Sequence, residues 1–110
     1  MMQLAAEPFE WVNAGQKIVE VRLFDEKRKK LALGDTIVFR SLDGNGVVRV
    51  RVRGLLRFDS FRDLFVFVPK EYLHHANLTV EEQVQRMRRY YSEEEEKKFG
   101  ILAIYFEVIR

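Results

Sequence analysis

Three charged residues near the start of the chain have the types and the spacing of a small polar site. Lys17, Glu20 and Arg22 follow directly after Gly15. A lysine in a desolvated cleft has a lowered pKa and can act as a base, a nucleophile or a phosphate ligand. Glu20 and Arg22 are two positions apart, so a strand places them on one face, where they could hold a ligand hydroxyl or a base edge. A solvated lysine beside a structural ion pair is the alternative.

The spacing of Lys17 and Glu20 sets a geometric condition on this site. They are three positions apart, so a regular strand would place them on opposite faces. The two side chains converge only where Lys17 precedes the strand or where a β-bulge intervenes. A Lys–Glu pair therefore requires an irregular start to the strand.

Basic residues form two further groups in the first half of the chain. Residues 1–57 carry 11 Lys and Arg against 7 Asp and Glu, whereas residues 58–110 carry 8 against 10. The groups are the run Lys27, Arg28, Lys29 and Lys30, and the alternating series Arg49, Arg51 and Arg53. Both could follow a phosphate backbone, each contact adding to the salt dependence of binding. A solvated loop and a solvated sheet face explain the same patterns.

Aromatic residues lie close to these charges. Phe9 and Trp11 precede the charged residues, and a ring there could stack on a base or pack into the core. Tyr90 and Tyr91 are neighbours, so one must face the core and the other could reach a cleft. We take Tyr90 as a candidate ligand contact.

The sequence offers little for metal or cofactor chemistry. His74 and His75 are the two histidines, and adjacent positions point in different directions, which makes a poor metal pair. The lack of cysteine excludes a disulfide, a thiolate zinc site, an iron–sulfur cluster and a cysteine nucleophile. The sequence also has no Gly-rich phosphate loop and no nucleophile elbow. We expect no metal and no cofactor.

Strand signals dominate the first half of the chain. A short helix over 7–14, ended by Gly15, precedes them. Strands are expected over 16–24, 36–40 and 47–58. Asp43-Gly44-Asn45-Gly46 supplies the glycines of a hairpin turn between the last two. Alternation of valine and arginine in the third strand predicts one buried face and one cationic face.

The second half of the chain is mainly helical. Capping-box patterns occur at Ser60 with Asp63, Thr79 with Glu82, and Ser92 with Glu95. The residues Val80, Val84, Met87 and Tyr91 have the spacing of an amphipathic helix. An apolar segment over 101–109 predicts a final, largely buried strand. The element order predicts an α+β fold with a mixed or mostly antiparallel sheet, compatible with a small barrel that the last strand closes.

Length and composition bound the class of protein. The chain has 110 residues, 47% apolar and 33% charged, with a net charge of +2. This predicts one globular domain over residues 1–110. No apolar run approaches the length of a membrane span, and the N-terminus lacks the pattern of a signal peptide. We expect a cytoplasmic protein that does not associate with a membrane.

Three features of the chain are typical of one known family. These are the motif Gly15-x-Lys17-x-x-Glu20-x-Arg22, the basic loop formed by residues 27–30, and Gly34-Asp35 before an apolar strand. In these features the chain resembles the ASCH family. The segment from Tyr90 to Gly100 and the closing strand also look like small archaeal and bacterial members. The resemblance implies a PUA-like β-barrel of five or six strands with flanking helices. It also implies a cleft for RNA or nucleotide recognition.

Some members of this family are amidohydrolases acting on N4-acylcytidine, and others are described as ribonucleases. The amidohydrolases use a Lys at the position of Lys17, a Thr three residues later and a Glu before a helix. This chain keeps the lysine but has Glu20 in place of the threonine and Ala76 in place of the glutamate.

These observations support three hypotheses. The first is a module that binds RNA or a nucleotide around Lys17, Glu20 and Arg22, with the other basic groups as peripheral electrostatics. The second is a hydrolase of nucleosides or RNA with Lys17 as base or nucleophile and Glu20 as proton carrier. The third is a protein-interaction module acting through the acidic run 93–96, for which a solvated helix start is an equal explanation.

Overall fold

The computed structural model describes residues 2–44 and 46–110. The strands are β1 (Met2–Leu4), β2 (Val19–Leu23), β3 (Thr36–Ser41), β4 (Val47–Phe58) and β5 (Ile101–Val108). The helices are α1 (Ala6–Asn13), α2 (Phe61–Phe67), α3 (Val80–Met87) and α4 (Glu93–Phe99), with the 3-10 helices η1 (Arg28–Lys30) and η2 (Lys70–Leu73). Within the described part of the chain no helix is long and apolar enough to cross a membrane.

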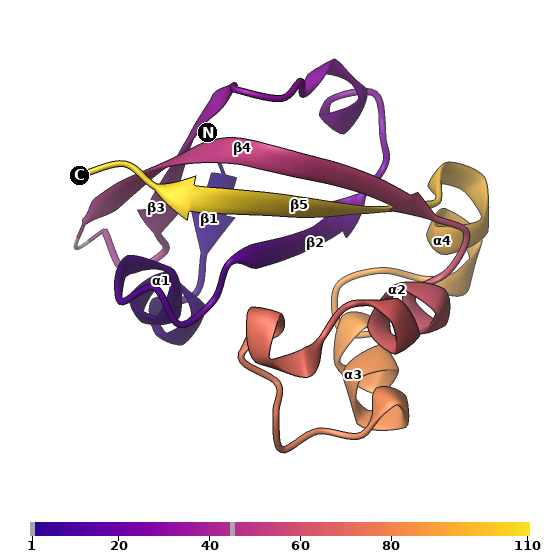
Figure 1. The fold of residues 1–110 in the computed structure, drawn as a ribbon. Helices are drawn as coiled ribbons and strands as arrows, with labels where there is room; N and C mark the ends of the chain where they lie inside the picture. The colour runs from indigo at the N-terminus through magenta and orange to yellow at the C-terminus, as the bar shows by residue number, and fades with distance from the viewer. Residues whose placement is uncertain (1, 45) are drawn as a thin grey trace.

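One curled sheet in the order β1-β3-β4-β5-β2 forms a half-barrel, with α1 near one end and α2 to α4 gathered at the other (Figure 1). Neighbouring strands are antiparallel except β1 and β3, which are parallel. The predicted α+β class and mixed sheet are confirmed. Strand β1 was not predicted, because a three-residue strand paired with a distant segment leaves no local pattern in the sequence.

The predicted hairpin joins β3 to β4. Arg40 pairs with Val47 at its base, and Gly44 has a φ of 79°, the left-handed conformation that glycine adopts without strain. Asn45 of the predicted turn lies outside the described residues. The turn signal therefore locates the hairpin correctly.

Strand β5 separates two hydrophobic cores, so both of its faces are buried. Leu102, Ile104 and Phe106 pack with α1, β1, β3 and β4 in the first core. Ile101 and Ala103 pack with β2, α2, η2 and α3 in the second core. This explains the near-continuous apolar composition that predicted a buried final strand.

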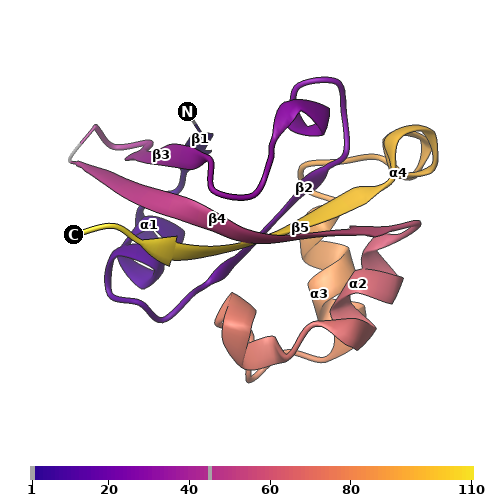
Figure 2. The same ribbon diagram turned by 45° about the horizontal axis from the view of Figure 1, so that its top comes forward.

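A bulge lets β4 contribute to both cores. Val48, Val50 and Val52 face the first core, and the register against β5 shifts between Val52 and Gly54. Beyond the shift, Phe58 packs in the second core. Gly54 lies under the ring of Tyr105, and a Cβ at this position would approach Tyr105 to 3.3 Å. Figure 2 shows β4 running the full length of the sheet.

The predicted helix starts are present after β4. Thr79 with Glu82 and Ser92 with Glu95 form complete capping boxes, whereas Ser60 contributes only its hydroxyl, which accepts from the Asp63 N–H. Helix α3 ends at Met87, so Tyr91 lies in the turn that follows rather than on the helix. Local capping signals thus locate each helix start.

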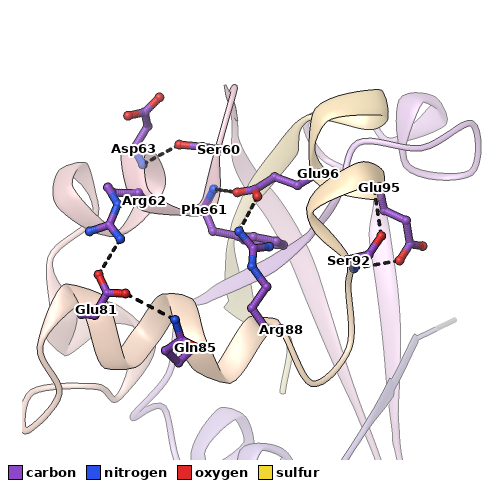
Figure 3. Close-up of polar contacts among 10 residues, drawn as sticks. All are labelled: Ser60, Phe61, Arg62, Asp63, Glu81, Gln85, Arg88, Ser92, Glu95 and Glu96. Carbon is purple, nitrogen blue, oxygen red and sulfur yellow. Dashed lines mark hydrogen bonds and ion pairs between the residues drawn. The ribbon is translucent and has the colours of Figure 1, made fainter.

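The Glu96 side chain of α4 forms hydrogen bonds with residues of α2 and at the end of α3 (Figure 3). Its buried carboxylate accepts from the Phe61 N–H at 2.6 Å and from Arg88 Nη2 at 2.6 Å. The Arg88 guanidinium also lies over the Phe61 ring, 5.7 Å from its centroid. One carboxylate on α4 therefore caps α2 and holds the end of α3.

Candidate functional site

Lys17 and Glu20 meet because Lys17 precedes the strand. Helix α1 ends at Asn13, and the N–H groups of Gln16 and Lys17 both donate to the Trp11 carbonyl. Lys17 is thus held in a turn before β2 begins at Val19. Its ammonium lies 2.9 Å from Glu20 Oε1. Of the two arrangements that allow the Lys17 and Glu20 side chains to converge, the structure has the one in which Lys17 precedes the strand.

Arg22 completes the cluster and spans a gap in the half-barrel. Its Nε and Nη2 lie 2.9 and 2.7 Å from Glu20 Oε2. Nη2 also donates to the main-chain carbonyl of Gln3 in β1, at 3.0 Å. Since β1 and β2 are the two edge strands of the curled sheet, we call this gap between them the seam (Figure 1).

Glu20 is buried and ionised between two cations. Its exposed fraction is 6%. Burial alone would raise the pKa of Glu20, but the charges of Lys17 and Arg22 and their hydrogen bonds lower it to about 2. At neutral pH the carboxylate is a permanent hydrogen-bond acceptor. It fits the role of holding donors better than that of carrying a proton.

Tyr91, rather than Tyr90, joins this cluster. Burial alone would lower the pKa of Arg22, but Glu20 and the nearby Tyr91 hydroxyl raise it. The Tyr91 ring stacks on Phe61 at 5.8 Å. Tyr90 is 71% exposed, and its ring centroid lies 6.4 Å from that of Tyr91. The sequence assigned Tyr91 to the core stripe and Tyr90 to a ligand contact, whereas in the structure Tyr91 is the one that acts on Arg22.

A cavity of about 430 Å³ lies between α1 and the segment that joins η2 to α3. It is lined by Glu7, Trp11, Glu71, His74, His75, Ala76, Asn77, Leu78 and Arg86. The rings of Trp11 and His74 are 4.4 Å apart. His74 has a φ of 59°, an uncommon conformation outside glycine. Phe9, by contrast, is buried in the first core.

His75 connects this cavity to the charged cluster. The nearby charges of Lys17 and Glu20 both act on its ring. Burial, reinforced by Lys17 and Arg86, lowers the pKa of His75 to about 4, so the imidazole is neutral at neutral pH. The sequence considered His75 only as a metal ligand. His75 lines the cavity because of the path of the segment between η2 and α3, and no local sequence pattern predicts that path.

The basic loop is partly neutralised by its own carboxylates. Arg28 pairs with Asp25 at 3.1 Å, and Lys29 pairs with Glu26 at 3.0 Å. Lys27 is exposed and makes no ion pair within the described residues. The loop therefore carries less available charge than its composition indicates.

The strand arginines lie on the other face of the sheet from Glu20. Glu20 pairs with Ile104, whose side chain is in the first core, so both occupy the inner face. Arg49, Arg51 and Arg53 alternate with valines of that core and therefore face outward. Arg53 Nε lies 3.6 Å from a carboxylate oxygen of Glu107. The structure brings Lys17, Glu20 and Arg22 together and leaves this stripe as a separate surface.

Across residues 2–44 and 46–110 no group of three or more His, Asp or Glu side chains lies close enough to hold an ion.

The chain is similar to known proteins over nearly its whole length. The ASCH domain model matches residues 2–110. The crystal structure of hypothetical protein PH0355 has 35% identity and a TM-score of 0.86, covering 98% of this chain and 96% of that one. The solution structure of PF0455 from Pyrococcus furiosus has 36% identity and a TM-score of 0.72, covering 99% and 96%. No curated protein matches the chain.

A more distant ASCH domain shows the same fold. The crystal structure from Lactobacillus crispatus has 12% identity and a TM-score of 0.67, and it covers 97% of this chain and 79% of that one. The predicted PUA-like α+β fold is thereby confirmed. The motif at the seam, the half-barrel and the match over residues 2–110 agree, and the chain belongs to the ASCH domain family.

Proposed function

We propose that the protein binds RNA or a nucleotide at the seam, as the ASCH family is thought to do. The observation that carries the proposal is the Lys17–Glu20–Arg22 cluster, in which one buried carboxylate holds two cations. The charges of Lys17 and Glu20 also act on His75, which lines the cavity. An ammonium has three hydrogens, and among the described residues Lys17 donates only to Glu20. Lys17 therefore has donors left for a ligand.

Each residue of the cluster has a distinct role in this proposal. Lys17 donates to a phosphate or carbonyl oxygen of the ligand. Glu20 accepts from donor groups on a base or sugar while it fixes the direction of the lysine side chain. Arg22 holds Glu20 in place and closes the seam. The exposed Lys27 and the outward arginines of β4 add long-range attraction for a polyanion.

A hydrolase acting on nucleosides or RNA is the second candidate function. The contact of Lys17 with Glu20 at 2.9 Å supports it, because that contact is the geometry a Lys–Glu pair requires. The low pKa of Glu20 restricts its role to that of an acceptor. Such an enzyme would use Lys17 as the group that donates or withdraws the proton.

Lys17→Ala tests both functions, with Lys30→Ala as the control. Lys30 is exposed and makes no ion pair among the described residues. We expect Lys17→Ala to weaken binding of a short single-stranded RNA by about tenfold or more, the effect of removing a charged hydrogen bond. Lys30→Ala should change affinity only slightly and chiefly at low salt. Fluorescence anisotropy at two salt concentrations measures both, and circular dichroism confirms that each variant is folded.

The same samples are incubated with N4-acetylcytidine and with the RNA, and products are separated by chromatography. Product that depends on Lys17 would establish the hydrolase. Binding that depends on Lys17 without product would establish the binding module. RNA affinity unchanged in folded Lys17→Ala would remove the seam as the binding site.

A further inference from the structure

The orientation of the His75 ring is fixed by a hydrogen bond to the buried side-chain amide of Gln83. Gln83 on α3 is fully buried, and its Nε2 lies 3.1 Å from His75 Nδ1. An amide nitrogen only donates, so this contact requires an unprotonated Nδ1 and places the ring proton on Nε2. Reversing the amide would leave two N–H donors, instead of one carbonyl oxygen, without a buried partner. The arrangement with Nε2–H therefore satisfies more of the polar groups.

The protonated nitrogen of His75, Nε2, is available to donate a hydrogen bond to a ligand. The two nitrogens of an imidazole point in divergent directions, so the contact of Nδ1 with buried Gln83 directs Nε2 away from that side chain. His75 lines the cavity beside Trp11 and His74. Among the described residues, Nε2 makes no hydrogen bond within the protein, and the His75 side chain is half-buried. The Nε2–H group is thus a donor of fixed orientation beside the rings of Trp11 and His74.

We propose that His75 is a ligand-binding residue, which donates from Nε2–H to an acceptor on the edge of a nucleobase whose ring lies against Trp11 and His74. This proposal rests on the proposed function and specifies which part of a nucleotide enters the cavity. Gln83 is the positioning residue that sets the tautomer.

The charges around the cavity favour a base over a phosphate group. Glu7 and Glu71 line it against the single guanidinium of Arg86, so its formal charge is negative. The pKa of His75, about 4, keeps the ring neutral at physiological pH. A neutral donor and an aromatic surface suit a planar heterocycle. A volume of about 430 Å³ lies in the range of small-ligand sites. In this proposal Lys17 contacts the phosphate group of the same nucleotide.

Binding of the four ribonucleoside 5′-monophosphates and of ribose 5-phosphate tests the assignment. Ribose 5-phosphate has the sugar and phosphate but no base. We expect the wild-type protein to bind at least one monophosphate about tenfold more tightly than ribose 5-phosphate. His75→Ala should lose this difference and keep its affinity for ribose 5-phosphate. His75→Gln, whose amide can place a donor where Nε2 lies, should retain most of the difference.

The outcomes separate this inference from the function on which it rests. Equal monophosphate affinity in wild-type protein and folded His75→Ala, with Lys17→Ala impaired, would overturn the role of His75 and leave the seam site standing. Equal binding of monophosphates and ribose 5-phosphate by the wild type would also overturn it. Absence of all binding, including that of RNA, would overturn both proposals.

The tautomer has its own test in the free protein. Nitrogen-15 NMR of the imidazole distinguishes a ring protonated at Nε2 from one protonated at Nδ1. We expect the Nε2–H form for His75 in wild-type protein and a change of tautomer or protonation in Gln83→Glu, because a carboxylate accepts from Nδ1–H. An Nδ1–H ring in the wild type would contradict the proposed donor.

Discussion

Glu20 is a buried carboxylate shared by two cations, and this sharing has an energetic consequence. A buried ion pair gains little over apolar packing, but removal of one partner leaves the others uncompensated. The change in the pKa of Glu20 from 4.5 to about 2 corresponds to roughly 3 kcal/mol of interaction with its surroundings. Burial opposes this interaction, so the two cations provide it.

Glu20→Gln should lower the free energy of unfolding by about 3 kcal/mol, because Lys17 and Arg22 keep their charges but lose the carboxylate. Urea unfolding followed by circular dichroism measures this loss. Glu26→Gln is the matched control, since Glu26 forms an exposed pair with Lys29 that contributes little. Equal stability of the two variants would contradict the assigned role of Glu20.

Acid should destabilise the protein in two ranges of pH. The folded-state pKa of His75, about 4, lies below its ordinary 6.5, so the unfolded chain binds the proton first and stability falls as pH drops from 6.5 to 4. Glu20 has a folded-state pKa of about 2 against 4.5, so its contribution is complete above pH 4.5 and is lost toward pH 2. Unfolding measured at a series of pH values should show both losses.

His75→Gln identifies the first range, because it removes only the histidine titration. The slope between pH 6.5 and 4 should then become shallower while the loss below pH 4.5 remains. An unchanged slope in this variant would assign the upper range to another group.

Residue-level prediction succeeded where the signal was local in sequence. The spacing of Lys17 and Glu20 gave the correct condition for their contact, because strand periodicity is a local rule. Tyr91 and His75 were not recognised as neighbours of the cluster. Their positions depend on how the segments around α3 fold back onto β2, and that path is set by tertiary packing.

At the scale of elements, the three helices after β4 are coupled through one side chain. Glu96 on α4 accepts from the first N–H of α2 and from Arg88 at the end of α3. The Tyr91 ring packs on Phe61 in the same region, and its hydroxyl lies near Arg22. The helices therefore support one wall of the seam.

Glu96→Ala should destabilise the protein by about 3 kcal/mol, since it leaves the half-buried Arg88 guanidinium and a helix N-terminus without a partner. Glu94→Ala, an exposed position on the same helix, should change stability by less than about 0.5 kcal/mol. Thermal unfolding of both variants checks the difference. Similar melting temperatures would show that Glu96 does not couple the helices.

Capping boxes and turn glycines located most elements, because they act within a few residues. Strand β1 escaped prediction for the opposite reason. Among the described residues it pairs with β3 alone, and parallel pairing of a three-residue segment depends on the closure of the whole sheet. The buried use of Glu96 was also hidden within a run of four glutamates that resembles a solvated helix start.

At the scale of the whole molecule, the cationic surfaces lie on different faces. The seam cluster is on the inner face of the sheet, and the arginines of β4 are on the outer face. A mononucleotide bound at the seam cannot contact both. A longer strand could pass around the edge of the sheet and reach the second surface.

Arg51→Ala should therefore leave mononucleotide affinity unchanged and weaken the binding of longer RNA. Loss of one phosphate contact should reduce the slope of log affinity against log salt concentration by about 0.7 for a single strand. Titrations at several salt concentrations, with both ligands, measure the two effects. Arg53→Ala should have a smaller effect, because Arg53 lies near Glu107. A lower mononucleotide affinity in Arg51→Ala would contradict the separation of the faces.

The two sheet edges at the seam bear on whether a strand of a second molecule could pair with this sheet. The edges of a sheet present unpaired main-chain groups, which are templates for adding a strand from a second molecule. Arg22 occupies a main-chain carbonyl at one such edge and places charge beside the other. The side chain that holds the candidate site together thus also occupies a main-chain acceptor that an added strand would need.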